Sequence, residues 1–302
     1  MNVNYTNLEK YIDKENIRYD EPMSKHTTLK VGGNCDVMVL PKTNEDILNV
    51  INFAKENNVP VTVIGNGSKL LVLDGGIRGI VIKLSSKFAS YTIEDNYIEV
   101  AAGMSLPRLS IIAKDNGLSG LEFAAGIPGN VGGAVYMNAG AYGSEMSNII
   151  EEVTFIDEAC NIKTISNEEC NFSYRNSIFR SKDYVILSTK LKLVHGNKEE
   201  IAALMNKNND SRREKQPLEY PNAGSTFKRP EGYFAGKLIQ DAGLAGFTVG
   251  GAQVSAKHCG FVINAGGATA ADIVELMKQV SDKVEELNGI PLEAEVKMVG
   301  EF

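Results

Sequence analysis

The chain has 302 residues, and its 31 basic against 38 acidic side chains give a formal net charge of −7. This acidic balance argues against a general nucleic-acid binder, which would carry a basic face. An apolar fraction of 43% with 23% charged residues excludes a disordered chain, and at about 150 residues per domain the length predicts roughly two domains. Because no run approaches the roughly 18 apolar residues of a membrane span and the N-terminus lacks a signal-peptide core, we expect a cytoplasmic protein with no membrane partner.

The first half of the sequence alternates between helix and strand patterns. Helices are predicted for residues 44–58 and 105–116, and strands for 59–65, 79–84 and 97–103. Ser105 is suited to cap the second helix, and Gly117 to stop it. This alternation predicts an α/β region with several short strands.

The second half continues with a hairpin pattern at 153–166 and a long strand at 183–194. The polar segment 195–221 begins as a helix and ends in charges and two prolines, so we place a domain boundary near 195–215.

Two elements are predicted near the C-terminus. Residues 269–289 form an amphipathic helix in which Thr269 and Asp272 are spaced as a capping box and Gly289 is the stop. Residues 293–299 alternate between apolar and charged side chains, which predicts a half-buried strand with Met298 inside and Glu295 outside.

The cysteines do not form a recognisable metal or redox pattern. The sequence has four, without a C-x-x-C pair: Cys35, Cys160, Cys170 and Cys259. We expect small apolar residues rather than a zinc site or a redox pair, and no metal centre.

Glycine is unusually frequent and clustered. The chain has 29 glycines, about 10% where roughly 7% is usual; seven lie within residues 120–143 and ten within 224–267. Such clusters mark places where the backbone turns sharply or approaches something closely.

The small glycine motif Gly65-Asn66-Gly67-Ser68-Lys69-Leu70-Leu71 directly follows a predicted strand. It is neither a dinucleotide fingerprint, because the third glycine is missing, nor a P-loop. Successive backbone amides in a tight turn can cradle a phosphate. On these residues alone an ordinary strand turn is the favoured interpretation.

The long glycine stretch from Gly126 to Gly143 reads G-I-P-G-N-V-G-G-A-V-Y-M-N-A-G-A-Y-G and contains no charged residue. A flexible surface loop would carry Ser, Asp or Lys, whereas this composition suits backbone pressed against a large flat ligand with a phosphate nearby. Buried structural packing is the alternative.

Five motifs together resemble one family. The long glycine stretch, preceded by G-N-G-S-K-L-L and followed by S-Y-R-N-S, N-A-G-S-T-F-K and L-E-A-E-V-K, closely resembles the UDP-N-acetylenolpyruvoylglucosamine reductases, also called UDP-N-acetylmuramate dehydrogenases. The motifs occur in the family's order from about residue 26 to 298, and A-V-Y-M-N-A-G-A-Y-G resembles the second structural type, which lacks a substrate-covering tyrosine loop.

The resemblance implies an α+β fold. Its FAD-binding domain, of the p-cresol-methylhydroxylase type, would cover residues 1–195 as two α/β subdomains, about 1–85 and 86–195. A smaller α+β substrate-binding domain would cover 196–302. The implied contacts of a noncovalent FAD are Gly65, Asn66, Gly67, Ser68, Lys69, Leu70, Gly103, Ile127, Pro128, Gly129, Gly132, Gly133, Asn138 and Ala139.

The resemblance gives catalytic roles to Arg175, Ser225 and Glu295. Without it, the favoured interpretations are a surface ion-pair residue, a turn serine and an exposed strand carboxylate. NADPH would reduce FAD and leave, and UDP-N-acetylglucosamine enolpyruvate would then take a hydride at C3 and a proton at C2, with ping-pong kinetics. Arg175 would stabilise the developing enolate, Ser225 would donate the proton, and Glu295 would assist only if it is protonated or shares a hydrogen bond with the substrate carboxylate.

Further residues are candidates for binding the UDP-linked substrate: Tyr142, Lys215, Lys228, Arg229, Lys237 and Lys257. For each lysine a solvated surface position is the alternative. Two residues depart from the family pattern, because Lys69 and Arg229 both stand where asparagine is common.

The implied product, UDP-N-acetylmuramate, would serve peptidoglycan synthesis, and hence cell-wall formation, cell shape and cell division. Two rival functions are an oxidase of sugars or hydroxy acids on the same flavin fold and a non-catalytic sugar-nucleotide sensor. An oxidase would not need Ser225 and Glu295 in their motifs. A degenerate sensor should have lost at least one of the three catalytic candidates, and all three are present.

Overall fold

The computed structural model describes residues 3–302, which fold into two compact units that are each discontinuous in sequence. Unit 1 comprises Met1–Arg18, Val37–Asn66 and Ile80–Arg212, and unit 2 comprises Tyr19–Asp36, Gly67–Gly79 and Arg213–Phe302. Each unit has its own apolar core. A four-stranded sheet has the order β1-β2-β5-β3, with the strands β1 (Ile17–Pro22), β2 (Asn34–Val39), β5 (Ile77–Lys83) and β3 (Val61–Ile64).

The continuous domains predicted from sequence, 1–195 and 196–302, therefore differ in outline from these units. The helix α4 (Lys198–Lys215), expected to open the second domain, lies in unit 1 as far as Arg212. Its residues Ile201 and Met205 form a small buried cluster with Ala125 of the long glycine region, which attaches the helix to unit 1.

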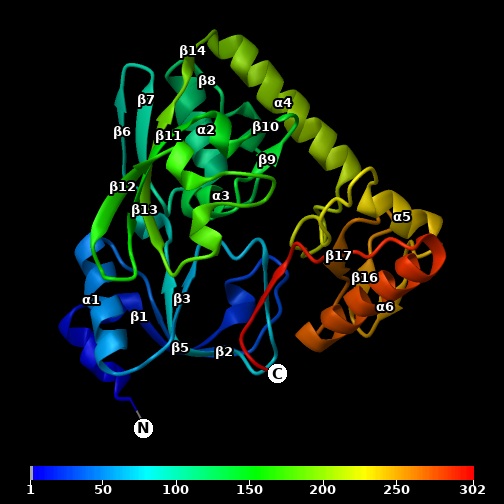
Figure 1. Cartoon of the computed structure of the whole chain (residues 1–302), viewed down its shortest axis with the longest axis horizontal. Helices are drawn as coiled ribbons and strands as arrows, with labels where there is room; N and C mark the ends of the chain where they lie inside the picture. The colour runs from blue at the N-terminus through cyan, green and yellow to red at the C-terminus, as the bar shows by residue number, and fades with distance from the viewer. Residues whose placement is uncertain (1–2) are drawn as a thin grey trace. The chain divides into compact units, whose positions relative to one another are not determined.

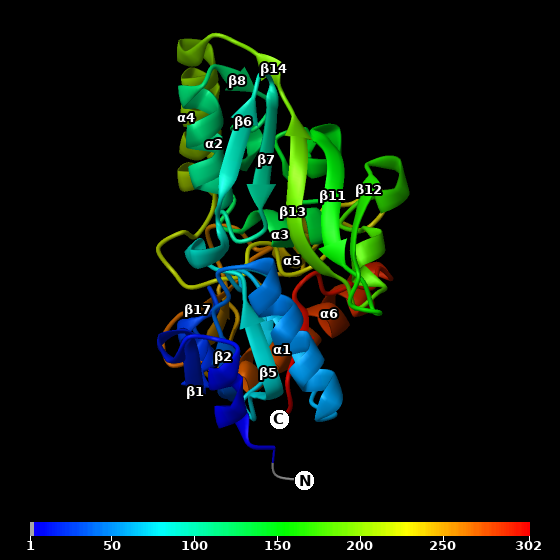
Figure 2. The ribbon, with the colours of Figure 1, turned by 90° about the vertical axis from the view of Figure 1, so that its left-hand side faces the viewer.

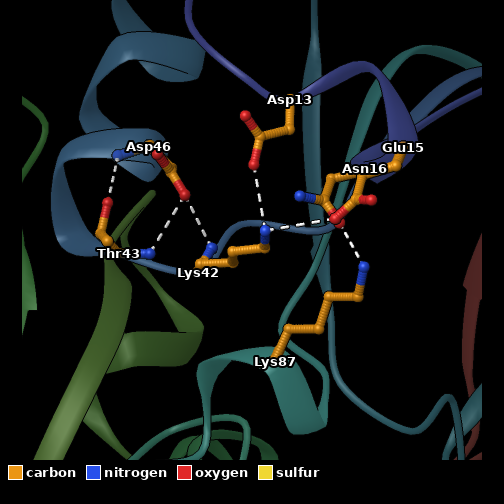
Figure 3. A network of polar contacts seen from close by, with 7 residues as sticks. All are labelled: Asp13, Glu15, Asn16, Lys42, Thr43, Asp46 and Lys87. Atoms are coloured by element: carbon orange, nitrogen blue, oxygen red, sulfur yellow. Dashed lines mark hydrogen bonds and ion pairs between the residues drawn. The ribbon is translucent and has the colours of Figure 1, made fainter.

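The helix α1 (Asn44–Glu56) confirms the first predicted helix, and local hydrogen bonds explain where it starts. Thr43 Oγ1 accepts from the Asp46 amide at 3.1 Å, and Asp46 Oδ2 accepts from the Thr43 amide at 3.1 Å, which completes a capping box (Figure 3). Lys42 Nζ lies 3.0 Å from Asp13 Oδ2 and 3.3 Å from Glu15 Oε1, so an ion-pair network extends from the start of the helix (Figure 3).

A five-stranded antiparallel sheet forms the rest of the unit 1 scaffold. Figure 2 shows its strands side by side in the order β12-β11-β13-β7-β6. The strands are β6 (Tyr91–Glu94), β7 (Tyr97–Ala101), β11 (Ile150–Ile156), β12 (Ile162–Ser166) and β13 (Val185–Lys192). The predicted hairpin and long strand are thus confirmed, and β11 pairs with both β12 and β13.

Two helices connect this sheet to the long glycine stretch. The helix α2 (Leu106–Asp115) has Ser105 at its N-cap and ends before Gly117, whose φ is +67°, as predicted. The short helix α3 (Val131–Tyr136) packs against β13 and β7. Four two-residue strands complete the unit: β8 (Leu118–Ser119) with β14 (Val194–His195), and β9 (Gly140–Ala141) with β10 (Ser144–Glu145).

Unit 2 is built on one long helix and two small sheets. The helix α6 (Ala270–Asn288) packs against a three-stranded sheet and the helix α5 (Ala235–Asp241) (Figure 1). The strands of that sheet are β15 (Thr248–Val249), β16 (Ala252–Val254) and β17 (Val262–Asn264). The capping box of Thr269 with Asp272 and the stop at Gly289 are both confirmed.

The C-terminal strand corrects a sequence prediction. The strand β18 spans only Lys297–Val299 and pairs in parallel with β4 (Leu70–Val72). Glu295 precedes the strand and is buried, whereas Met298 is 49% exposed, so the predicted alternation is wrong at both positions. The physical reason is that the Glu295 amide donates to Thr226 O at 2.8 Å. The residues before β18 therefore bond to the segment around Thr226, whereas β18 itself pairs with β4.

Three of the four cysteines are buried, as expected of small apolar residues, and Cys160 is half-buried. Burial raises the pKa of the Cys170 thiol to about 12 and that of Cys35 to about 11. Within residues 3–302, His, Cys, Asp and Glu side chains do not gather in threes in a way that could hold a metal ion. No helix in the described part of the chain has the length and apolar character needed to cross a bilayer.

Candidate active site

The long glycine stretch uses adjacent glycines for different purposes. At Gly132 an added Cβ would lie 2.8 Å from Ala102 Cβ, and the Gly132 amide donates to Ala102 O at 2.9 Å, so this position is needed for packing. At Gly133 an added Cβ would meet no described atom within 4 Å, and the residue is exposed. Gly133 therefore leaves backbone open to an approaching ligand in the first turn of α3, where helix amides lack intrahelical acceptors.

The first glycine motif meets this stretch within unit 1. Asn66 Nδ2 donates to Pro128 O at 2.7 Å, and an added Cβ at Gly65 would lie 3.3 Å from Asn130 Cβ. Asn130 Nδ2 in turn donates to Gly103 O at 3.0 Å. The structure thus brings together predicted FAD contacts from three separate segments, and Ile127 and Gly129 lie in the same turn, where the Gly129 amide donates to Ile127 O.

The remainder of the first motif, Gly67 to Leu70, belongs to unit 2. Gly67 has a φ of +63°, and an added Cβ would lie 2.2 Å from His26 O, so only glycine fits. Ser68 is half-buried, and Leu70 begins β4.

Asn138 is a fully buried side chain with its polar atoms already engaged. Its Nδ2 donates to Glu145 Oε1 at 2.9 Å and to Ser173 O at 3.2 Å, and its Oδ1 accepts from the Ser147 amide at 2.9 Å. The predicted FAD contact therefore uses its side chain to hold the segment that carries Arg175. Ala139 follows it and is half-buried.

Arg175 lies in a tight turn closed by reciprocal backbone hydrogen bonds between Ser173 and Asn176, each 3.1 Å. Its φ is +55°, a left-handed conformation uncommon for a side chain other than glycine, asparagine or aspartate. Its Nη2 donates to Gly140 O at 3.1 Å, and its guanidinium lies 5.1 Å from the Tyr174 ring centroid. The turn holds a half-buried guanidinium beside the long glycine stretch.

Ser225 and Glu295 are brought together in unit 2 by the residue that departs from the family pattern. Lys69 Nζ lies 2.8 Å from Glu295 Oε1 and donates to Ser225 O at 2.6 Å. The Glu295 side chain is only 5% exposed, against 24% for Lys69. Ser225 follows Gly224, whose φ is +72°. The Lys69 side chain, predicted as a cofactor contact, is thus directed at the two catalytic candidates of this unit.

The cations predicted to bind the substrate all belong to unit 2: Lys215, Lys228, Arg229, Lys237 and Lys257. Lys228 and Lys237 pair with the carboxylates of Glu293 and Asp241, and Lys257 Nζ donates to Arg213 O at 2.9 Å. The Arg229 guanidinium stacks 3.9 Å from the Phe234 ring centroid, and Lys215 is exposed. These contacts do not gather the five cations into a single anion site.

Two unit 1 residues complete the description. Tyr142, the remaining predicted substrate contact, is 48% exposed and donates from its hydroxyl to Asn208 O at 2.7 Å. Arg212 was not predicted, yet its Cδ would lie 3.0 Å from a Cβ added at Gly126, and burial lowers the pKa of its guanidinium. Helical spacing could have found it, because Arg212 continues the buried series of Ile201, Met205 and Asn208 along α4.

Two family models match separate parts of the chain. Residues 35–166 match the profile of an FAD-binding domain, and residues 216–299 match the C-terminal domain of UDP-N-acetylenolpyruvoylglucosamine reductase. Together with the glycine-lined scaffold of unit 1, they define an α+β flavoprotein.

Full-length relatives identify the family. The chain is 49% identical to a UDP-N-acetylenolpyruvoylglucosamine reductase of Clostridioides difficile, over 98% of both chains, and 47% identical to one of Caldanaerobacter subterraneus subsp. tengcongensis, over 97% of both. The crystal structure of the reductase from Thermus caldophilus superposes with a TM-score of 0.81 at 36% identity, covering 94% of this chain and 98% of that one. The chain belongs to the UDP-N-acetylenolpyruvoylglucosamine reductase family.

Proposed function

We propose that this protein reduces UDP-N-acetylglucosamine enolpyruvate to UDP-N-acetylmuramate with NADPH, as an FAD-dependent enzyme of peptidoglycan precursor synthesis in the cytoplasm. The observation that carries the proposal is the pairing of Ser225 and Glu295 around one ammonium in a chain of this family.

The residues of unit 1 fit a bound FAD. Gly133 presents open backbone where a side chain would stand, and its neighbour Gly132 lets α3 approach Ala102 closely. Backbone amides carry positive potential without charged side chains, which explains how an acidic chain could hold a pyrophosphate. When bound, FAD supplies the hydride that the enolpyruvyl group receives, after taking it from NADPH.

Arg175 is the residue proposed to bind the substrate carboxylate. Hydride arrival at C3 of an enolpyruvyl ether pushes negative charge toward C2 and the carboxylate. A guanidinium is permanently charged and can fork onto two carboxylate oxygens, so it stabilises that charge as it develops. The hydrogen bonds of Asn138 to the neighbouring turn would keep Arg175 aimed during the reaction.

Ser225 is the residue proposed to donate the proton to C2. A hydroxyl is a weak acid, so the carbanion opposite it must be strongly basic. The backbone around Ser225 is firmly held, because the Gly224 amide donates to Asn222 Oδ1 at 2.9 Å and the Thr226 amide donates to Gly260 O at 2.8 Å. Glu295 completes the cluster from the segment before β18.

The two half-reactions can be followed by the colour of the flavin. We expect the purified protein to be yellow, to bleach when NADPH is added without oxygen, and to recover its colour when UDP-N-acetylglucosamine enolpyruvate follows. A colourless protein that cannot be reconstituted with FAD would refute the proposal. Turnover of an alcohol with oxygen as acceptor would instead support the oxidase alternative.

The two adjacent glycines provide a matched test of where FAD binds. Gly133→Ala fills open space, so the FAD-free protein should stay as stable as the parent while FAD affinity falls. Gly132→Ala would press against Ala102 and should destabilise the FAD-free protein itself, by about 1–3 kcal/mol. FAD affinity is measured by flavin fluorescence titration, and an unchanged affinity in Gly133→Ala would contradict FAD binding at the start of α3.

A further inference from the structure

Lys69 is held next to the catalytic candidates of unit 2 by backbone pairing as well as by its side chain. It immediately precedes β4, and Lys69 O accepts from the amide of Lys297, the first residue of β18. Glu295 lies just before that strand. The parallel pairing of β4 with β18 therefore brings the base of the Lys69 side chain beside Glu295, although the two residues are 226 positions apart in the sequence.

The Lys69 ammonium joins two groups that come from different segments. It lies 2.8 Å from Glu295 Oε1 and donates to Ser225 O at 2.6 Å. An added Cβ at Gly224 would lie 3.5 Å from Lys69 Nζ, so the turn before Ser225 passes closely over the ammonium. One side chain thus sets the distance between the Ser225 turn and the Glu295 carboxylate.

The charge of this arrangement bears on the reaction. A carboxylate as buried as that of Glu295 is costly to ionise without a partner, and an unpaired negative charge there would repel a substrate that is itself a carboxylate. The ammonium at 2.8 Å cancels the charge of Glu295. The Lys69–Glu295 pair therefore carries no net charge, and it does not repel the substrate carboxylate as a lone carboxylate would.

We propose that Lys69 is a positioning residue for the second half-reaction, which offsets the charge of the Glu295 carboxyl group and holds the Ser225 turn in place. The proposal rests on the proposed function and depends on the positive charge of the Lys69 side chain. In this chain the substrate carboxylate would meet a neutral Lys69–Glu295 pair rather than a lone carboxyl group.

A double-mutant cycle on Lys69 and Glu295 tests this inference. The proteins are the parent, Lys69→Met, Glu295→Gln and the double variant. Lys69→Arg is a charge-conserving rescue, and Lys278→Met, which removes an exposed ion pair with Asp282 on α6, is a control. For each protein, rates are measured for flavin bleaching by NADPH and for colour recovery with the enolpyruvyl substrate. The urea midpoint of the FAD-free protein is the third readout.

The expected result is a selective loss that depends on Glu295. In Lys69→Met, colour recovery should fall about 100-fold further than bleaching, because the buried carboxylate of Glu295 has lost the ammonium that lies 2.8 Å from it. Lys69→Arg should restore most of the parent's ratio of recovery rate to bleaching rate. The double variant should recover its colour no more than about threefold more slowly than Glu295→Gln, because the carboxylate charge that Lys69 offsets is already absent from Glu295→Gln.

The FAD-free midpoints should show the same coupling, with Glu295→Gln raising the midpoint of Lys69→Met. Equal losses in both half-reactions, or effects of the two substitutions that simply multiply, would overturn the role of Lys69. A parent protein that NADPH bleaches but the enolpyruvyl substrate does not restore would overturn the proposed function instead. The midpoint cycle uses no substrate, so it separates the two failures.

Discussion

The left-handed backbone of Arg175 makes an unusual prediction about stability. At most positions alanine is more stable than glycine, by about 0.5–1 kcal/mol, because glycine loses more backbone freedom on folding. At a φ of +55° the order should reverse, since a Cβ in this conformation costs roughly 1–2 kcal/mol. Arg175→Gly and Arg175→Ala both lose the guanidinium and its bond to Gly140 O, so their difference isolates the backbone.

The backbone-entropy cost of glycine partly offsets the left-handed strain of alanine, which leaves glycine favoured over alanine at residue 175 by about 1 kcal/mol. With a urea m-value of about 2 kcal/mol/M, this corresponds to a midpoint about 0.5 M higher for Arg175→Gly. The chain contains no tryptophan, so the transition is followed by far-UV circular dichroism on FAD-free protein. The neighbouring Tyr174, whose φ is not positive, is the matched control, and there the alanine variant should be the more stable.

An Arg175→Ala protein as stable as Arg175→Gly would refute the reasoning, because the turn would then accept a Cβ without strain. Neither variant should catalyse the reaction: we expect colour recovery with the enolpyruvyl substrate to fall about 10²–10³-fold in both. A stabilised but inactive Arg175→Gly would show that the strain is retained for the position of the guanidinium.

Three further predictions concern catalysis, capping and pH. Ser225→Ala should keep flavin bleaching by NADPH but slow colour recovery about 10²–10⁴-fold, and equal losses in both steps would contradict a proton-donor role. Asp74 accepts from two amides at the start of α6, at 2.8 and 2.9 Å, so Asp74→Ala should lower the free energy of unfolding by about 1–2 kcal/mol; an unchanged urea midpoint would show that Thr269 suffices. Hydrogen bonding to Lys163 lowers the pKa of Asp157 to about 2, so its stabilisation is present above the unfolded value of about 3.9 and is lost as the pH falls toward 2. The difference in urea midpoint between the parent and Asp157→Asn should therefore shrink across that range, and a constant difference would argue against the shift.

Local signals in the sequence predicted the elements well. The capping box before α6 and the left-handed Gly289 after it are determined by residues a few positions apart, so a single sequence contains the necessary information. The same holds for Ser105 and Gly117 around α2.

The errors and omissions arise from contacts between distant segments. Glu295 was expected outside because its neighbours alternate, but its orientation depends on Thr226 and on an ammonium near the other end of the chain. Lys69 was predicted as a cofactor contact, and no local rule pairs it with Glu295. Arg175 carries no sequence signal for a positive φ, since arginine is not a residue that favours this conformation.

The interleaved units have a consequence for how the protein is made. The strand β18 begins 225 positions after its partner β4 ends, so β4 leaves the ribosome long before β18 is synthesised. At about 5–20 residues per second, the nascent β4 waits for on the order of ten seconds or more with its edge unpaired. Unit 2 therefore stays incomplete until β18 has been synthesised, and a chain truncated shortly before β18 would keep the FAD-domain sequence of residues 35–166 but leave β4 without this partner.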